Sequence, residues 1–284
     1  MYRAAFRIPL PDGRLLELGP RTLVMGVINV TPDSFSDGGE RLDPDVAVAD
    51  ALRMVDAGAD LLDIGGETTR PRSQPLSADE ELRRVTPVLE RLAGRVRVPI
   101  SIDTYKATVA ERALDLGATI VNDISALEFD PALAVLVARR RAAVVLMHTR
   151  GRPEDMHTRT QYADVVAEVG RELGERVRAA ESAGIAADAI IVDPGIGFAK
   201  DASQSFSLVT GVPSIAALGR PVLVGPSRKS FLTLALGEVP PSERVWGTAA
   251  AVTAAVLGGA HIIRVHDVRE MVQVVRVADE LRRH

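Results

Sequence analysis

The sequence has no cysteine, few aromatic residues and no excess of positive charge. Without cysteine the chain can form no disulfide, thiolate metal site or cysteine nucleophile, and the absence is compatible with a reducing compartment. A formal net charge of −4 and a pI of about 5.8 leave no basic surplus to neutralise nucleic-acid phosphates. No apolar run approaches the roughly 18 residues of a membrane span, and residues 1–13 lack the pattern of a signal peptide. We therefore expect a cytoplasmic protein that binds neither nucleic acid nor membranes.

From residue 22 onward, short β-branched runs alternate with longer stretches of helical periodicity. We expect strands at 22–29, 59–66, 98–104, 119–124, 142–148, 189–195, 221–227 and 261–266. We expect helices near 44–58, 78–93, 106–116, 130–140, 161–183, 203–218, 228–257 (broken at Pro240-Pro241) and 267–282. Continuously apolar strands covered by helices are typical of a parallel sheet, and eight such units without a linker predict a (β/α)₈ TIM barrel. A doubly wound open sheet is the competing architecture.

The expected organisation is a single domain over residues 1–284, with the barrel at 22–282. Residues 5–18 precede the barrel and have the pattern of a β-hairpin that turns at Asp12-Gly13. Such a hairpin would close the bottom of the barrel.

Polar residues lie at or near the end of every predicted strand. They are Asn29, Asp63, Asp103, Asn122 with Asp123, His148, Asp193, Ser227 and His266. In a TIM barrel these ends converge on the carboxyl face, where active sites lie. A competing interpretation is that they cap the following helices. Directly after the first strand, the polar loop NVTPDSFSDGG (29–39) is suited to cover the mouth of the barrel without an apolar core of its own.

Common catalytic motifs are absent. GIGFAK at 195–200 has lysine where a dinucleotide-binding loop needs its third glycine, and GPSRKS is neither a P-loop nor a nucleophile elbow. The five histidines do not have zinc-ligand spacing. Acidic and amide groups at the mouth, with Lys229 and Arg264 as cations, indicate a small substrate that combines a hydrogen-bonding ring with an anionic group.

Taken together, NVTPDSFSDGG, GGETTRP, SIDT, NDI, LMH, DPGIGF, SRKSF and RVHDV resemble the motifs of dihydropteroate synthases, in order from about residue 22 to the end. The resemblance implies a TIM barrel, usually a homodimer, that acts in folate biosynthesis. The reaction it implies joins 6-hydroxymethyl-7,8-dihydropterin pyrophosphate to p-aminobenzoate, giving 7,8-dihydropteroate and pyrophosphate, with Mg²⁺ assisting. The partners are therefore small molecules, and sulfonamides would compete with p-aminobenzoate.

The resemblance also assigns residues to each substrate. The pterin would contact Asp103, Asn122, Met147, Asp193 and Lys229. The pyrophosphate would contact Asn29, Arg264 and His266, with Asn29 also a ligand of Mg²⁺. The p-aminobenzoate pocket would contain Thr69, Arg70, Pro71, Phe198 and Ser230. The groups closest to the chemistry would be Asp33, Asp103, Lys229, Arg264 and His266, and the loops containing Asp33 and Arg70 would fold over the bound pterin.

The sequence departs from the usual family pattern near the p-aminobenzoate pocket. GGESTRPG has become GGETTRPR, so Thr68 and Arg72 replace serine and glycine, and DPGIGFGK has become DPGIGFAK at Ala199. Thr149 replaces a methionine outside the expected contacts. These departures leave open a catalytically inactive paralogue that binds pterin. A methyltetrahydrofolate–corrinoid methyltransferase and a barrel for an unrelated phosphorylated substrate also stay open at this point.

Overall fold

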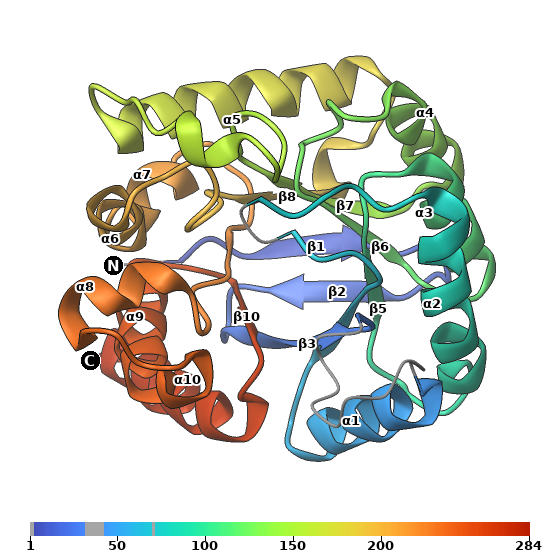
Figure 1. Cartoon of the computed structure of the whole chain (residues 1–284), viewed down its shortest axis with the longest axis horizontal. Helices are drawn as coiled ribbons and strands as arrows, with labels where there is room; N and C mark the ends of the chain where they lie inside the picture. Colours follow the sequence, from blue (N-terminus) through green and yellow to red (C-terminus); the bar gives the residue numbers. More distant parts are fainter. Residues whose placement is uncertain (1–2, 32–42, 70–71) are drawn as a thin grey trace.

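Eight parallel strands form a barrel, around which the helices make a ring (Figure 1). The structure, a computed structural model, describes residues 3–31, 43–69 and 72–284. In barrel order the strands are β3 (Leu23–Asn29), β4 (Leu61–Gly65), β5 (Ile100–Asp103), β6 (Ile120–Asp123), β7 (Ala143–Met147), β8 (Ile190–Asp193), β9 (Leu223–Val224) and β10 (Ile262–Val265). A parallel bridge from Val192 to Val222 brings β8 and β9 together at the two ends of the sheet. The predicted TIM barrel is confirmed, and the open sheet is excluded.

The helices cover the outer face of the barrel, and all except the single turn of α8 have buried residues. They are α1 (Pro44–Asp56), α2 (Ala78–Leu92), α3 (Ala107–Asp115), α4 (Pro131–Arg140), α5 (Val165–Ser182), α6 (Ala202–Thr210), α7 (Val212–Ala216), α8 (Thr233–Leu236), α9 (Val245–Leu257) and α10 (Val268–Arg283). In α2 the spacing of Val85, Val88, Leu89 and Leu92 puts all four on one buried stripe. Within the described ranges no helix has the length and apolarity needed to span a membrane.

The residues that cap the helices are not the polar residues at the strand ends. Side-chain caps come from Asp43, Ser77, Asp130, Asp164 and Asp201, each of which accepts a hydrogen bond from a backbone N–H in the first helical turn. For Asp63, Asp103, Asn122 and Asp193 the interpretation as helix caps is therefore wrong. Asp123 instead holds the turn after β6, where it accepts from the backbone N–H groups of Ser125 and Leu127, both at 2.7 Å.

Two helices differ from the prediction. The expected helix at 203–218 is divided at Gly211 into α6 and α7, because Pro213 has no N–H to donate to the preceding turn. The expected helix from 228 is a 3₁₀ turn over Ser230–Leu232 followed by the single turn of α8, and α9 begins only at Val245, after the two prolines at 240–241. Both stretches have helical periodicity, but proline and glycine break the backbone.

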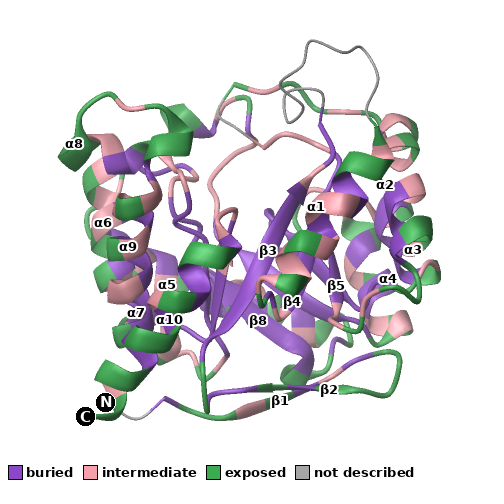
Figure 2. Ribbon diagram, turned by 90° about the horizontal axis from the view of Figure 1, so that it is seen from below, coloured by how far each residue is buried: buried purple, intermediate pink, exposed green. Residues whose placement is uncertain are grey.

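An antiparallel hairpin closes the bottom of the barrel. Strands β1 (Phe6–Pro9) and β2 (Leu15–Leu18) lie across the lower end of the barrel in Figure 2. Their apolar side chains pack against inward-facing barrel residues in one cluster of Ile8, Leu10, Leu16, Leu18, Leu23, Met25, Leu61, Ile120, Ala143, Val145, Ile191, Leu223 and Ile262. Burial of each large side chain contributes about 1.5–3 kcal/mol. The interior of the barrel is therefore apolar and closed at this end.

Candidate active site

A network of charged and amide side chains lies inside the carboxyl end of the barrel. Arg264 on β10 donates from Nε to Asp63 Oδ2 and from Nη2 to Asp103 Oδ2, both at 2.6 Å. Asn122 Nδ2 donates to the same Asp63 oxygen at 3.0 Å. Asp63 is fully buried, and its Oδ1 has no hydrogen-bond partner among the described residues. Asp103 and Asn122, which the sequence predicts to bind the pterin, thus lie in one network with Arg264. Asp63 links Asn122 to Arg264, and the sequence predicts no substrate contact for Asp63.

Burial sets the charges of this network. It raises the pKa of Asp103 to about 7, although Arg264 acts in the opposite direction. Burial also disfavours the charged form of Arg264, but the attraction of Asp63 and Asp103 outweighs it and raises the pKa of Arg264. Arg264 therefore stays cationic, whereas Asp103 can gain or lose a proton near neutral pH.

Asp193 ends β8 and begins a tight turn. The backbone N–H of Gly195 donates to Asp193 Oδ1 at 2.7 Å. Gly195 has a φ of +68°, and a Cβ at this position would lie 2.0 Å from the carbonyl oxygen of His148, so only glycine fits. Burial raises the pKa of the Asp193 carboxyl, with Lys229 as the main opposing influence. The turn therefore holds a buried carboxylate at the end of β8.

Lys229 and Phe198 lie together beside an apolar wall. The Lys229 ammonium donates to the carbonyl oxygen of Ile196 and lies 4.6 Å from the centroid of the Phe198 ring. Burial lowers the pKa of Lys229 to about 8, while Asp193 acts to raise it. Phe198 packs against a small cluster of Tyr105, Ile124 and Met147, with Phe129 on its edge. An apolar wall with a cation at its edge suits a planar heterocycle.

His266 is held by Ser227, the polar residue that follows β9. Ser227 Oγ accepts from the backbone N–H of His266 at 3.2 Å and lies 3.0 Å from His266 Nδ1. In the tautomer that carries its proton on Nε2, His266 accepts from the Ser227 hydroxyl through Nδ1. Burial, followed by the Arg264 charge, lowers the pKa of His266 to about 4. At neutral pH His266 is an uncharged donor.

A guanidinium–carboxylate pair joins the two loops that carry Lys229 and His266. Arg228 has a left-handed backbone (φ 59°), and its guanidinium binds Asp267 through Nε at 3.0 Å and also through Nη2. Bidentate pairs of this kind fix orientation as well as distance. Sequence reasoning misses this pair, although Arg228 and Asp267 lie inside the SRKSF and RVHDV motifs.

Three of the other predicted site residues lie within the described part of the chain, and three lie outside it. Asn29 is the partly buried last residue of β3, Thr69 is partly buried after β4, and Ser230 is exposed at the start of the 3₁₀ turn. Only the single turn of α8 follows that 3₁₀ turn. Asp33, Arg70 and Pro71 lie outside the described residues, so their expected roles stay predictions.

Both positions where the sequence replaces a family glycine keep a left-handed backbone. Arg72 has a φ of 69° and Ala199 a φ of 50°. Arg72 also donates its backbone N–H to the carbonyl oxygen of Pro153 at 2.8 Å, which joins the loops after β4 and β7. The glycine-like geometry survives at both places, with the added side chain bearing a conformational cost of about 1–2 kcal/mol for an L-residue.

Replacing Ala199 by glycine is expected to raise the free energy of unfolding by about 1 kcal/mol, because the left-handed backbone no longer carries a Cβ. Chemical denaturation measures this. The matched control is Ala179→Gly in the exposed last turn of α5, which should lower stability by up to about 1 kcal/mol. A loss of stability in Ala199→Gly similar to that of the control would contradict the assigned strain.

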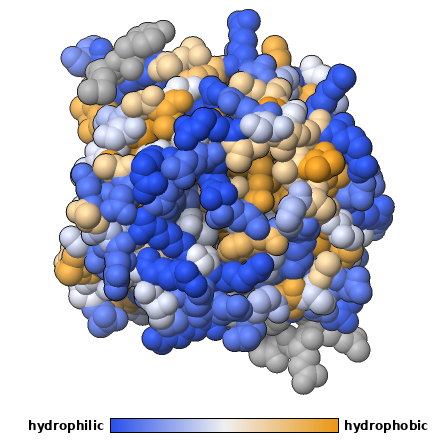
Figure 3. Space-filling model, turned by 90° about the horizontal axis from the view of Figure 1, so that it is seen from above, coloured by the Kyte–Doolittle hydropathy of each residue, from blue (hydrophilic) through white to orange (hydrophobic). Residues whose placement is uncertain are grey.

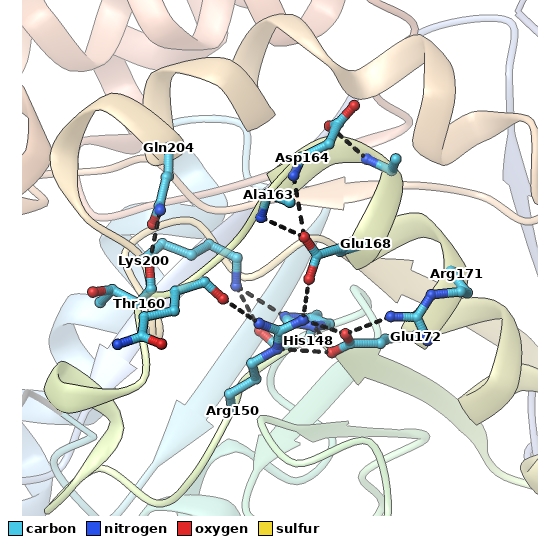
Figure 4. A network of polar contacts seen from close by, with 12 residues as sticks. His148, Arg150, Thr160, Ala163, Asp164, Glu168, Arg171, Glu172, Lys200 and Gln204 are labelled. Atoms are coloured by element: carbon cyan, nitrogen blue, oxygen red, sulfur yellow. Dashed lines mark hydrogen bonds and ion pairs between the residues drawn. The ribbon is translucent and has the colours of Figure 1, made fainter.

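A second polar network, to which sequence reasoning assigns no role, lies behind the loop after β8 (Figure 4). His148 at the end of β7 has Nε2 2.8 Å from Glu172 Oε2 and Nδ1 3.0 Å from Lys200 Nζ. Arg150 donates to Glu168 at 2.7 Å and to Glu172. Beside this network lies a cavity of about 680 Å³, lined by residues of the loops after β6 and β7 and of α5, including Thr149. From the sequence, His148 is recognisable only as one of the strand-end residues.

A third network anchors the loop after β4. The Lys106 ammonium binds both Glu67 and the fully buried Glu81, and Tyr105 donates to Glu67 Oε1 at 2.8 Å. Glu67 belongs to the GGETTRP segment, immediately before Thr68 and Thr69. The base of the predicted p-aminobenzoate loop is thus fixed to α2 and to the loop after β5.

The family model described as pterin binding enzyme matches residues 25–266. The chain belongs to this family. Among its curated relatives, the dihydropteroate synthase of Synechocystis sp. is 47% identical over 277 residues, which is 97% of this chain and 96% of that protein. The relationship thus extends over nearly the whole length of both proteins.

Solved structures of this pterin-binding family agree. The dihydropteroate synthase of Xanthomonas albilineans with 4-aminobenzoic acid has a TM-score of 0.90 and 44% identity, covering 98% of each chain. The same organism's enzyme in complex with 7,8-dihydropteroate has a TM-score of 0.86 and 43% identity, covering 97% of this chain and 98% of that one. The fold and family expected from the motifs are therefore confirmed, and the likeness supports dihydropteroate synthase activity.

Proposed function

We propose that the protein joins 6-hydroxymethyl-7,8-dihydropterin pyrophosphate to p-aminobenzoate, forming 7,8-dihydropteroate and pyrophosphate. The observation that carries the proposal is the mouth of the barrel, where buried carboxylates, an amide and two cations surround an apolar wall within a chain closely similar to dihydropteroate synthases. The bond from the pterin methylene carbon to pyrophosphate oxygen breaks and its electron pair leaves with pyrophosphate. The aromatic amine then bonds to that carbon and releases a proton.

The pterin is proposed to bind between Asp193, Asn122, Asp103 and Lys229. A pterin edge presents an amino group and a ring N–H, and a buried carboxylate such as Asp193 can accept from both. The Asn122 amide can donate and accept, and Asp103 faces the far edge of the ring. Lys229 would donate to pterin acceptor atoms, while Met147 supplies apolar contact to the ring. Asn122 and Asp193 are buried, and Asp103 and Lys229 are partly buried. This burial supports the arrangement, since water competes poorly for their hydrogen bonds.

Pyrophosphate is proposed to leave toward Arg264 and His266. Negative charge grows on the leaving group, and a fixed cation at that place lowers the barrier. The Arg264 fork is already oriented by two carboxylates, and the neutral His266 can donate from Nε2. His266 therefore contributes a hydrogen bond rather than a charge to the free enzyme.

Asn29 fits a magnesium ion that arrives with the pyrophosphate. The described part of the chain has no group of three or more His, Cys, Asp or Glu residues that could hold a metal by itself. A neutral amide oxygen suits Mg²⁺, which commonly keeps phosphate and water ligands. When bound, the ion would neutralise charge on the leaving pyrophosphate. Asn29 would orient it from the end of β3.

p-Aminobenzoate is proposed to bind against Phe198, between Ser230 and the loop after β4. Phe198 offers an aromatic face, and Pro71 would lie on the other side of the ring. Ser230 is exposed and can donate to the carboxylate, while Thr69 and Arg70 would complete the pocket. Asp33 would stabilise the pterin cation that forms as pyrophosphate leaves, once both polar loops have excluded water.

The deciding experiment measures pyrophosphate release from the purified protein given dihydropterin pyrophosphate and Mg²⁺, with and without p-aminobenzoate. Release that depends on p-aminobenzoate, with equimolar dihydropteroate, is the expected result. Tight pterin binding without release would instead identify an inactive paralogue, with Arg72 as the first residue to revert to glycine.

We also propose that the protein is a homodimer that associates through α8, α9 and α10. Among the described residues, six of the nine large hydrophobic side chains that are exposed lie on these helices: Leu234, Leu236, Trp246, Leu257, Val277 and Leu281. Contiguous exposed apolar surface commonly marks an interface. The face on the α5 side, seen in Figure 3, is by contrast predominantly hydrophilic.

Replacing Trp246 by glutamate is expected to convert the dimer to monomer at micromolar concentration, because Trp246 is 77% exposed and would place a charge in the interface. Analytical ultracentrifugation measures the change. Val135→Glu is the matched control, since Val135 is 63% exposed on α4, away from this surface. Dissociation in the control alone would put the interface elsewhere.

The single-domain organisation over residues 1–284 and the cytoplasmic location remain proposals. The first is supported by the apolar cluster that the hairpin shares with the barrel strands. The second is supported by the absence of cysteine from the sequence.

A further inference from the structure

Lysine is rare in this chain. Of the 34 basic residues only Lys106, Lys200 and Lys229 are lysine, and the others are arginine. None of the three is exposed, and all follow the carboxyl ends of barrel strands. Lys229 belongs to the proposed pterin site and Lys106 anchors the loop after β4. Lys200 is the one that the proposed chemistry does not use.

The Lys200 ammonium is held by three acceptors. Its Nζ lies 2.7 Å from the carbonyl oxygen of Phe198, 3.0 Å from His148 Nδ1 and 3.3 Å from the carbonyl oxygen of His148. The residue is only 7% exposed. Burial lowers the pKa of Lys200, with the Asp193 charge as the main opposing influence. In its charged form Lys200 has three N–H groups on one atom and can donate to all three acceptors from one point, whereas the planar guanidinium of arginine is larger and cannot. The need for lysine here is thus geometric.

His148 and Glu172 give this contact a fixed direction. Burial lowers the pKa of His148 to about 4, so its imidazole is neutral at pH 7. Because Nε2 faces the Glu172 carboxylate at 2.8 Å, Nε2 carries the proton and Nδ1 accepts from Lys200. Glu172 is held in turn by Arg150 Nε and Arg171 Nη2, both at 3.1 Å (Figure 4). The chain of contacts therefore runs from α5 through β7 to Lys200.

The loop held by Lys200 is conformationally costly. Gly195, Gly197 and Ala199 all have positive φ, at 68°, 78° and 50°. Gly195 is pressed against the carbonyl oxygen of His148, and the N–H of Phe198 returns to the carbonyl oxygen of Gly195 at 3.0 Å. Such a backbone persists only where its surroundings determine it. Lys200 supplies that constraint at the far end, where it holds the Phe198 carbonyl.

We propose that Lys200 is a positioning residue for p-aminobenzoate, which fixes Phe198 through its carbonyl oxygen and is itself oriented by His148 and Glu172. The inference deepens the proposed function and rests on it. Asp193, at the near end of the loop, is held independently: its carbonyl oxygen accepts from His148 N at 2.9 Å within the strand pairing, and its carboxylate from Gly195 N. Loss of the Lys200 contacts should therefore affect the aromatic amine more than the pterin.

The test is Lys200→Met, which keeps an unbranched side chain one atom shorter than lysine and removes the N–H donors of Nζ. We expect the KM for p-aminobenzoate to rise at least tenfold. The Kd of dihydropterin pyrophosphate, measured by calorimetry, should change less than threefold, and so should kcat at saturating p-aminobenzoate. Arg176→Met is the matched control, because Arg176 lies on the same helix as Glu172 and pairs only with Glu128 in the contacts described, at 2.7 Å. It should change none of the three constants.

A second pair of variants keeps the proposal testable if Lys200→Met fails to fold. His148→Asn retains a side-chain oxygen that can accept from Lys200, whereas His148→Leu does not. The leucine variant should reproduce the rise in KM and the asparagine variant should largely restore it. An unchanged KM in Lys200→Met or His148→Leu, or an equal loss of affinity for both substrates, would overturn the positioning role. Absence of dihydropteroate formation by the unmodified protein would instead refute the proposed function itself.

Discussion

Replacing Arg264 by methionine is expected to lower kcat/KM by about 10³, the scale seen when one preorganised group that stabilises transition-state charge is removed. The same change should lower the free energy of unfolding by about 3 kcal/mol, because Asp63 and Asp103 are left buried without their common cation. Turnover assays and denaturant unfolding measure the two losses. Arg264 thus differs from a residue that only binds substrate, since its removal damages the folded site as well.

The stability loss in Arg264→Met should depend on pH. The folded pKa of Asp103 is about 7, above its ordinary value of 3.8, so the folded state binds the extra proton and stability falls as pH rises from about 4 to 7. Arg264 holds this pKa down, so its removal raises the pKa of Asp103 further and extends the fall to higher pH. The difference in the free energy of unfolding between Arg264→Met and the unmodified protein should therefore be small at pH 5 and larger at pH 8.

An exposed pair supplies the control for Arg264. Arg21 donates from Nη1 to Asp60 at 2.8 Å and is more than half exposed, so Arg21→Met should cost less than about 1 kcal/mol. If Arg264→Met is as stable as this control at pH 8, Arg264 does not neutralise the buried carboxylates. The assigned network would then be wrong.

Replacing Asp193 by asparagine is expected to weaken binding of dihydropterin pyrophosphate roughly 100-fold, since a charged acceptor of pterin N–H groups becomes a neutral amide that places a donor against a donor. Calorimetry measures this loss. Stability should not fall. Burial raises the pKa of Asp193 in the folded state above its ordinary value of 3.8. Ionisation of Asp193 therefore lowers the free energy of unfolding as pH rises above 3.8, and asparagine, which does not ionise, removes this loss.

Asp201→Asn is the matched control for Asp193→Asn. Asp201 lies at the end of the same loop and caps α6 by accepting from Gln204 N at 2.8 Å. Asparagine caps a helix about as well as aspartate, so neither binding nor stability should change. A large fall in the melting temperature of Asp193→Asn, with pterin affinity retained, would make Asp193 a structural residue.

Much of the fold is predictable because its signals are local. Continuous apolar runs identify the strands, and the Asp12-Gly13 turn identifies the hairpin, which the structure closes with Gly13 at a φ of 84°. The stretch from 228 misleads because its composition is helical, while Gly237 ends the turn of α8 and α9 begins only at Val245, beyond the two prolines. Periodicity reports the apolar face of a segment, but a single residue can decide where the backbone breaks.

The site is predictable as a set of residues but not as a set of partners. The motifs identify Asp103 and Arg264 separately, and the contact between them spans 161 positions of sequence. No local pattern indicates that Asp63 joins Arg264 to Asn122. Nor does any local pattern indicate that Lys200, which replaces the third glycine of a dinucleotide-binding motif, donates to His148. Such pairings arise only when the barrel brings strand ends together. Asp33, Arg70 and Pro71 lie outside the described residues, so their roles remain predictions.

The scarcity of lysine has a practical consequence for anyone handling the protein. Reagents that acylate amines have, besides the α-amino group, only three side-chain targets, and every one lies in or beside the substrate-binding end. Attaching the protein to a biosensor through its amines would therefore risk blocking the surface under study, and attachment through an added tag is preferable. Conversely, protection of Lys229 from acylation by bound pterin would give a site-specific signal of occupancy, because few other amines contribute to the background.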